Sequence, residues 1–189
     1  VCGEGTIELN SECVILDPLV CGEGTIELNS ECVILCVEGL TNVDGECTCY
    51  EGFTNVDSLC YYQTDLDVLQ DIIDVNESLS GEEPLGIGGQ EWNDGRLFSL
   101  SLQYNQLTTL PESIGNVSSL ERLYLHVNQL TSLPESIGNI SSLEYLGLSY
   151  NQLTSIPESI GNLSSLETLW LSSNQLTNLP ESIRDLSSL

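Results

Sequence analysis

The sequence lacks lysine altogether and carries only three basic residues, Arg96, Arg122 and Arg184, against 29 acidic ones. The formal net charge is therefore −26 at pH 7. A surface this negative repels phosphate backbones and anionic membranes, so the composition argues against nucleic-acid binding. It favours positively charged partners or divalent ions, whereas the alternative interpretation is that the carboxylates only keep the protein soluble.

Residues needed for catalysis are also scarce. The single histidine, His126, has no Asp or Glu placed by sequence to orient it, so a Ser-His-Asp or Cys-His nucleophile is not expected. The glutamates of the second half recur with the repeat period described below, which indicates duplication rather than an active site. The segment Gly86-Ile-Gly88-Gly89 does not complete a phosphate-binding G-x-G-x-x-G loop. The sequence therefore predicts no enzyme and no cofactor.

Long apolar runs and methionine are absent as well. No stretch of roughly 18 or more apolar residues occurs, so no membrane span is expected. The chain starts at Val1 without a visible signal peptide, which a mature product or a fragment of a longer protein would explain. All eight cysteines lie between Cys2 and Cys60, a density that predicts disulfides and an extracellular or cell-surface location. Their spacing does not suit zinc, so no metal site is predicted.

The second half of the chain repeats with a period of 23 residues. The repeats are marked by four asparagines, Asn105, Asn128, Asn151 and Asn174. Around each lies the frame L-x-x-L-x-L-x-x-N-x-L, for example from Leu143 to Leu153. The x-x-L-x-L-x-x run predicts a strand with its leucines in the core, and the asparagine amide is expected to pair with the backbone of the neighbouring turn. A proline in each copy predicts an extended or short helical return, and the copies must stack to bury their apolar faces.

This frame resembles the leucine-rich-repeat pattern, and the motif L-P-E-S-I-G-N-L-S-S-L-E resembles the 23-residue typical class of that family. The class occurs in intracellular Ras-associated proteins, in plant and algal proteins and in bacterial surface proteins. The resemblance implies an α/β solenoid, a horseshoe with parallel strands on its concave face. It does not fix the compartment.

The cysteine region contains a second repeat. Residues 1–16 recur unchanged at 20–35, and two further units follow, each with ten residues between its cysteines. Four tandem loops, each a hairpin, are the expected structure. Pairing within units would join Cys2 with Cys13, Cys21 with Cys32, Cys36 with Cys47, and Cys49 with Cys60.

A different pairing follows from a second resemblance. The stretch from Cys47 to Cys60, with Gly52 and Phe53, is similar to the C-terminal half of an EGF-like domain. That resemblance implies pairing of Cys21 with Cys36, Cys32 with Cys47, and Cys49 with Cys60. An Asp stands where EGF-like domains often carry a glycine before the last cysteine. Both schemes stay open at this point.

The segment between the two repeat systems predicts one amphipathic helix over 64–79. Thr64 and Asp67 resemble a capping box, and Asp65 suits the positive end of the helix dipole. A loop and Trp92 follow, an order similar to the N-terminal cap of plant-type extracellular repeat proteins, in which Trp92 would cover the open end of the core. The expected regions are therefore 1–60 (tandem Cys-loop or EGF-like), 61–95 (helix and cap) and 96–189 (four repeats and the start of a fifth, with the C-terminal cap missing).

Candidate binding residues are those that vary between copies on the predicted concave face. They include exposed aromatics near an arginine, the usual composition of binding hot spots. The candidates are Arg122, Tyr124, His126, Tyr145, Tyr150 and Trp170. The alternative is that copies drift wherever packing does not constrain them.

Four N-x-S sequons provide candidate glycosylation sites, or else mark ordinary turns. They begin at Asn76, Asn116, Asn139 and Asn162. Together these observations predict a non-enzymatic extracellular recognition or adhesion module, a glycoprotein that binds a protein or glycan on its concave face. The alternative is a structural or surface-coat protein that self-associates.

Overall fold

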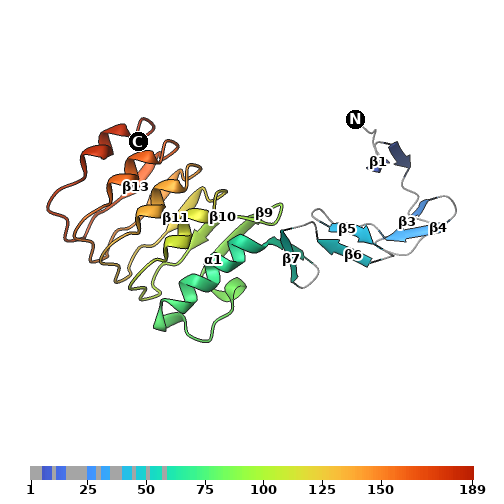
Figure 1. Cartoon of the computed structure of the whole chain (residues 1–189), viewed down its shortest axis with the longest axis horizontal. Coiled ribbons are helices and arrows are strands. Elements are labelled where there is room, and N and C mark those ends of the chain that lie inside the picture. The colour runs from blue at the N-terminus through green and yellow to red at the C-terminus, as the bar shows by residue number, and fades with distance from the viewer. Residues whose placement is uncertain are drawn as a thin grey trace. The chain divides into compact units, whose positions relative to one another are not determined.

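The computed structural model describes the backbone of strands β1 to β6, residues 52–56, and residues 59–189, with side chains from residue 52 onward. The chain forms two compact units, Val1–Cys60 and Tyr61–Leu189. Figure 1 shows hairpins in the first unit and a coil of repeats in the second. Each unit is described by itself.

Short antiparallel hairpins make up the first unit. β1 (Thr6–Leu9) pairs with β2 (Glu12–Ile15), β3 (Thr25–Leu28) with β4 (Glu31–Ile34), and β5 (Leu40–Val43) with β6 (Glu46–Cys49). β7 (Phe53–Val56) and β8 (Leu59–Tyr62) form a further two-stranded sheet. The tandem hairpins predicted from the cysteine units are thus confirmed for the first three pairs. Cys60 is buried and disulfide-bonded, whereas the predicted pairings and the EGF-like resemblance involve residues outside the described side chains.

The helix of the second unit is shorter than predicted. α1 spans Gln63–Asp74, and a separate 3-10 turn, η1, spans Glu77–Leu79. The helix begins after Tyr62 without a side-chain cap, so the predicted capping box of Thr64 and Asp67 is wrong. Asn76 interrupts the helix because its amide binds backbone groups elsewhere, as described below. Among the residues described, no helix has the length and apolar character needed to cross a membrane.

Asp65 joins α1 to the first repeat. Its carboxylate is fully buried and accepts hydrogen bonds from Arg96 Nε at 2.9 Å and from the backbone N–H of Leu97 at 3.0 Å. The Arg96 guanidinium also lies 4.0 Å from the centre of the Tyr62 ring. Asp65 lies in the first turn of α1, as predicted, and it also forms a buried ion pair that was not predicted. A sequence signal existed, because Asp65, Leu69 and Ile72 share one helical face and the last two are core residues.

A five-stranded sheet forms one side of the coil, in the order β13-β12-β11-β10-β9. The four repeat strands are parallel: β10 (Arg96–Ser101), β11 (Arg122–Tyr124), β12 (Tyr145–Gly147) and β13 (Thr168–Trp170). β9 (Gly89–Asn93) pairs antiparallel with β10 at the edge and carries Trp92, which packs against the core. β9 is a strand that the sequence pattern does not predict.

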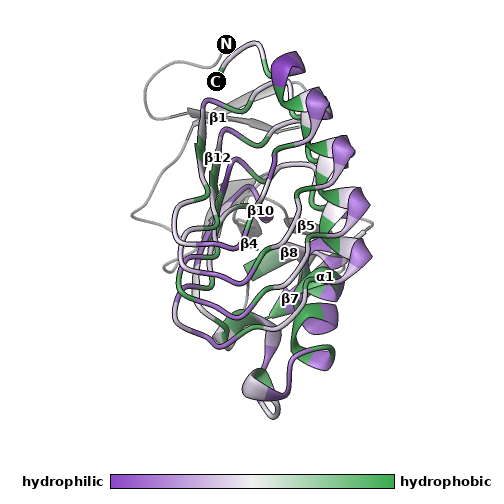
Figure 2. Cartoon of the chain, turned by 90° about the vertical axis from the view of Figure 1, so that its left-hand side faces the viewer, coloured by the Kyte–Doolittle hydropathy of each residue, from purple (hydrophilic) through white to green (hydrophobic). Residues whose placement is uncertain are grey.

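Short 3-10 turns form the opposite side, as Figure 2 shows. They are η3 (Glu112–Asn116), η4 (Glu135–Asn139), η5 (Glu158–Asn162) and η6 (Glu181–Asp185), and each follows a proline. A further turn, η2 (Pro84–Gly86), precedes β9. The predicted short helical return is confirmed. Between the two sides the leucines and isoleucines of the first three repeats are almost completely buried, whereas most of those of the fourth repeat are partly buried or exposed. α1 adds Val68, Leu69 and Ile72 to the same core.

Buried asparagine amides tie each turn to the next. Asn128 Oδ1 accepts from the backbone N–H of Asn105 and Leu107, and its Nδ2 donates to the carbonyls of Leu102 and Leu125, at 2.8 to 3.1 Å. Asn151 and Asn174 repeat this arrangement one and two repeats further on. The predicted asparagine ladder is confirmed.

The residue before each marker asparagine adopts the left-handed backbone conformation. These residues are Tyr104, Val127, Tyr150 and Ser173, with φ between 55° and 62°. Valine is strained there, because a β-branched side chain rarely tolerates positive φ.

Adjacent 3-10 turns approach closely through a glycine of one repeat and a serine of the next. A Cβ atom at Gly115, Gly138 or Gly161 would overlap the backbone carbonyl of Ser136, Ser159 or Ser182 respectively. In the fourth repeat, Arg184 stands at the equivalent position. The glycines therefore set the spacing of the turns on this side of the coil.

We expect Asn151→Ala to lower the free energy of unfolding by about 3 kcal/mol, because three buried backbone groups lose their partner. Urea denaturation measures the change. Asn162→Ala is the matched control, since Asn162 is exposed, and it should stay within about 0.5 kcal/mol of the wild type. Equal effects of the two substitutions would contradict the role of the ladder.

Val127→Asn should raise the free energy of unfolding by about 1 kcal/mol, because asparagine tolerates the left-handed conformation that strains valine. Val75→Asn is the comparison: Val75 is also exposed but has a φ of −91°. The same denaturation series tests both variants, and a gain at position 75 equal to that at 127 would argue against relief of backbone strain.

Candidate functional site

The outward side chains of the parallel strands form a surface that we call the strand face. Pairing places them in register, so that Tyr124 lies beside Gly147, which lies beside Trp170. A parallel column brings Arg122 beside Tyr145 and Tyr145 beside Thr168. The strand face corresponds to the concave face predicted from the sequence.

Four aromatic rings meet on this face. Tyr124 and Tyr145 have ring centroids 4.6 Å apart with a tilt of 36°. His126 lies edge-on to both Tyr145 and Trp170, with centroids 6.3 Å apart in each case. We call Tyr124, His126, Tyr145 and Trp170 the aromatic cluster. Trp170 is 53% exposed and the other three rings are half-buried, so the cluster is partly accessible to solvent.

The absence of a side chain at Gly147 makes this arrangement possible. The imidazole of His126 lies directly over Gly147, where a Cβ atom would overlap Nε2. Nε2 is 3.2 Å from the Tyr145 hydroxyl, within hydrogen-bonding distance. The His126 ring of one repeat thus occupies the space that a side chain at Gly147 of the next repeat would take, and it contacts both Tyr145 and Trp170. The sequence showed Gly147 only as one more variable position.

Both titratable groups of this contact are held neutral. Burial lowers the pKa of His126. Burial, followed by the nearby Tyr124, raises the pKa of the Tyr145 hydroxyl. At neutral pH, a neutral imidazole therefore faces a neutral phenol, and either group can donate, depending on the tautomer.

Two of the predicted binding residues are not part of the aromatic cluster. Arg122 lies 3.4 Å from Glu91 and its guanidinium is 5.0 Å from the centre of the Phe98 ring, so its charge is already paired. Tyr150 is 61% exposed beyond the end of β12, where its left-handed backbone places it at the edge of the strand face. Ser149, just before Tyr150, is buried and its hydroxyl accepts a hydrogen bond from the Ser172 hydroxyl at 2.9 Å.

The predicted glycosylation of Asn76 is contradicted by its position. Asn76 is 1% exposed, and its Nδ2 donates to the carbonyls of Ile72 and Thr109 while its Oδ1 accepts from the N–H of Thr108. A glycan needs an exposed amide, whereas this amide fastens the end of α1 to the first repeat. Asn116, Asn139 and Asn162 are exposed at the ends of their 3-10 turns, and glycosylation there stays a prediction.

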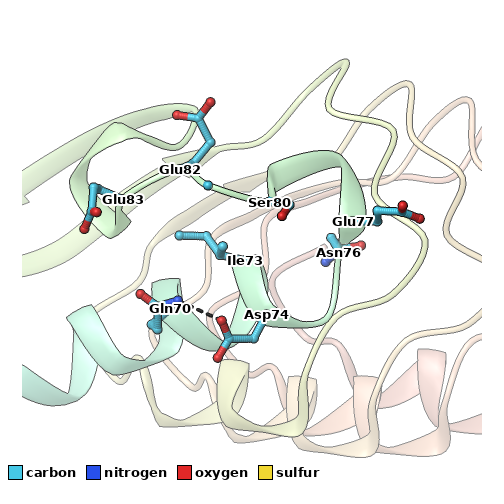
Figure 3. Close-up of a pocket in the computed structure, with 9 residues that line it drawn as sticks. Gln70, Ile73, Asp74, Asn76, Glu77, Ser80, Glu82 and Glu83 are labelled. Carbon is cyan, nitrogen blue, oxygen red and sulfur yellow. Dashed lines mark hydrogen bonds between the residues drawn. The ribbon is translucent and has the colours of Figure 1, made fainter.

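An acidic pocket of about 430 Å³ lies beside α1 and η1. Figure 3 shows Gln70 donating a hydrogen bond to Asp74 on one side of the pocket, while the side chains of Glu77, Glu82 and Glu83 point in different directions. Within residues 52–56 and 59–189, no three His, Cys, Asp or Glu side chains are grouped to hold a metal ion. This pocket therefore does not qualify as a cation site.

The lone imidazole allows a direct test of the contact between His126 and Tyr145. Because burial lowers its pKa, we expect an NMR titration midpoint below the ordinary value of about 6.5. A lowered folded-state pKa means that the unfolded chain binds the proton more readily, so acidification below about pH 6.5 should destabilise the fold. His126→Gln should remove this part of the pH dependence. A midpoint at or above the ordinary value would contradict the burial.

Two family models match the repeats: one described as "Leucine Rich repeats (2 copies)" matches residues 141–188, and one described as "Leucine rich repeat" matches residues 95–153. None of the proteins with curated descriptions matches the chain. A leucine-rich-repeat protein of Leptospira interrogans is 45% identical over 49% of this chain and 24% of its own length, with a TM-score of 0.49.

Two plant structures share the fold over a longer stretch. The leucine-rich-repeat ectodomain of the receptor kinase SOBIR1 from Arabidopsis thaliana is 30% identical, covers 68% of this chain and 77% of its own, and has a TM-score of 0.58. The ectodomain of GASSHO1/SCHENGEN3 from the same plant, in complex with CASPARIAN STRIP INTEGRITY FACTOR 2, is 25% identical over 67% of this chain and 17% of its own, with a TM-score of 0.55. With its repeat frame, asparagine ladder and parallel sheet, the chain belongs to the leucine-rich-repeat family.

Proposed function

We propose that this chain is a non-enzymatic protein-binding module that engages its partner through the strand face. The observation that carries the proposal is the aromatic cluster. Its four residues vary from repeat to repeat, yet they pack on one another rather than pointing independently into solvent. Rigid, partly exposed aromatic side chains are the usual anchors of protein interfaces.

The similar structures support this proposal in a general way. SOBIR1 is a receptor kinase whose ectodomain has this fold, and the GASSHO1/SCHENGEN3 ectodomain was solved in complex with CASPARIAN STRIP INTEGRITY FACTOR 2. By analogy, the partner is a protein or peptide, and the module acts outside the cell or at its surface. A glycan partner has less support from this analogy, because the complex named above contains a protein factor.

Other parts of the chain have supporting roles in this proposal. α1, β9 and Trp92 would close the N-terminal end of the repeat core, since all three contribute to or pack on it. The cysteine hairpins at 1–60 would be a separate disulfide-stabilised region. Glycans at Asn116, Asn139 and Asn162 would lie on the side of the 3-10 turns, away from the strand face.

An interaction screen against secreted proteins and glycans tests the proposal. We expect at least one partner whose binding falls about 30-fold or more in a variant combining Tyr124→Ala, Tyr145→Ala and Trp170→Ala, since hot-spot residues each contribute about 2 kcal/mol or more. Circular dichroism checks that the variant folds.

A variant combining Val75→Ala and Leu179→Ala is the control, because both side chains are exposed and lie outside the cluster. Partners lost equally in both variants, or found only for the hairpin region, would overturn the assignment to the strand face. Concentration-dependent self-association without any other partner would favour the alternative of a surface-coat protein.

A further inference from the structure

We infer that the partner of the strand face is a basic peptide segment, with a Lys or Arg side chain held between the aromatic cluster and a column of glutamates beside it. This inference rests on the proposed function and specifies the chemistry of the partner. It depends on three observations: the position of the glutamates, their lack of counter-charges, and the exposure of the rings.

The glutamate column consists of Glu121, Glu144 and Glu167. Each immediately precedes the first residue of a repeat strand, namely Arg122, Tyr145 or Thr168. The backbone N–H of Glu144 donates to the carbonyl of Glu121 at 2.8 Å, and that of Glu167 donates to Glu144 at 2.9 Å. Because bonded strands repeat at about 4.8 Å, the backbones of the three glutamates follow one another at short, regular intervals along the edge of the sheet where the strands begin.

No positive charge of the described chain neutralises this column. Arg96 is paired with Asp65 and Arg122 with Glu91, while Arg184 belongs to η6 on the opposite side of the coil. Within residues 59–189, none of the three glutamates takes part in an ion pair. Glu144 and Glu167 are exposed and Glu121 is half-buried, so a cation from a partner can reach them.

The rings next to the column favour the same charge. The faces of Trp and Tyr attract Lys and Arg side chains through the ring quadrupole. Tyr145 and Trp170 belong to β12 and β13, the strands that Glu144 and Glu167 immediately precede. A basic side chain on the strand face would therefore be attracted by both the rings and the carboxylates. An acidic ligand would be repelled by the column and by the net charge of −26.

A random peptide library displayed on phage and selected against the full oxidised chain tests the inference without a known ligand. We expect the selected peptides to be enriched in Lys or Arg next to apolar residues. Their affinity should fall at least tenfold in a variant combining Glu121→Gln, Glu144→Gln and Glu167→Gln. It should also weaken as salt is raised, because screening reduces the attraction between exposed charges.

The matched control combines Glu112→Gln, Glu135→Gln and Glu181→Gln, which removes the same net charge from the 3-10 turns. It should change the affinity less than threefold. Equal weakening in both variants would show only attraction to the overall charge and would overturn the inference. Neutral or acidic peptides that lose binding in the Tyr124, Tyr145 and Trp170 variant would also overturn it, while leaving the proposed function intact. Peptides insensitive to the aromatic variant would contradict both.

Discussion

The amide of one asparagine in each of the last three repeats is the interaction on which the second unit depends. The repeat strands β11 to β13 are only three residues long, so strand pairing alone provides few hydrogen bonds between copies. Asn128, Asn151 and Asn174 each bind backbone groups on both sides of a joint, and Asn76 does the same between α1 and the first repeat. Leaving these backbone groups buried without a partner would be costly. The ladder therefore fixes the register that brings side chains of different copies into columns.

The features predicted correctly from the sequence are those that recur. A period of 23 residues identifies the strands, the turns and the asparagine ladder because each repeat carries leucine, asparagine and proline at the same positions. The features that were missed depend on contacts between different parts of the chain. The ion pair of Asp65 and Arg96 joins residues far apart in sequence, and β9 is a strand only because β10 offers it an edge. Likewise, the position of His126 depends on the missing side chain of Gly147 in the following copy.

The variable residues of the strand face are thus not independent of one another. Drift between copies would leave side chains that differ but do not fit together, whereas Tyr124, Tyr145, His126 and Trp170 form consecutive ring contacts. Burial also lowers the pKa of His126 and raises that of Tyr145, which keeps both groups uncharged in an otherwise acidic protein. The aromatic cluster is therefore an uncharged surface, and the glutamate column beside it carries the negative charge.

The glycines on the opposite side bear on how such an array can change in length during evolution. A repeat inserted next to Gly115, Gly138 or Gly161 carries its own glycine and serine. It can therefore pack against both neighbouring repeats at the spacing already present. At the fourth copy, Arg184 occupies the equivalent position, and its side chain would fill the volume that a neighbouring serine backbone takes elsewhere. Unequal recombination can therefore add or remove copies at three joints without changing the spacing of the turns, whereas any unit packed against η6 has to adopt a different spacing.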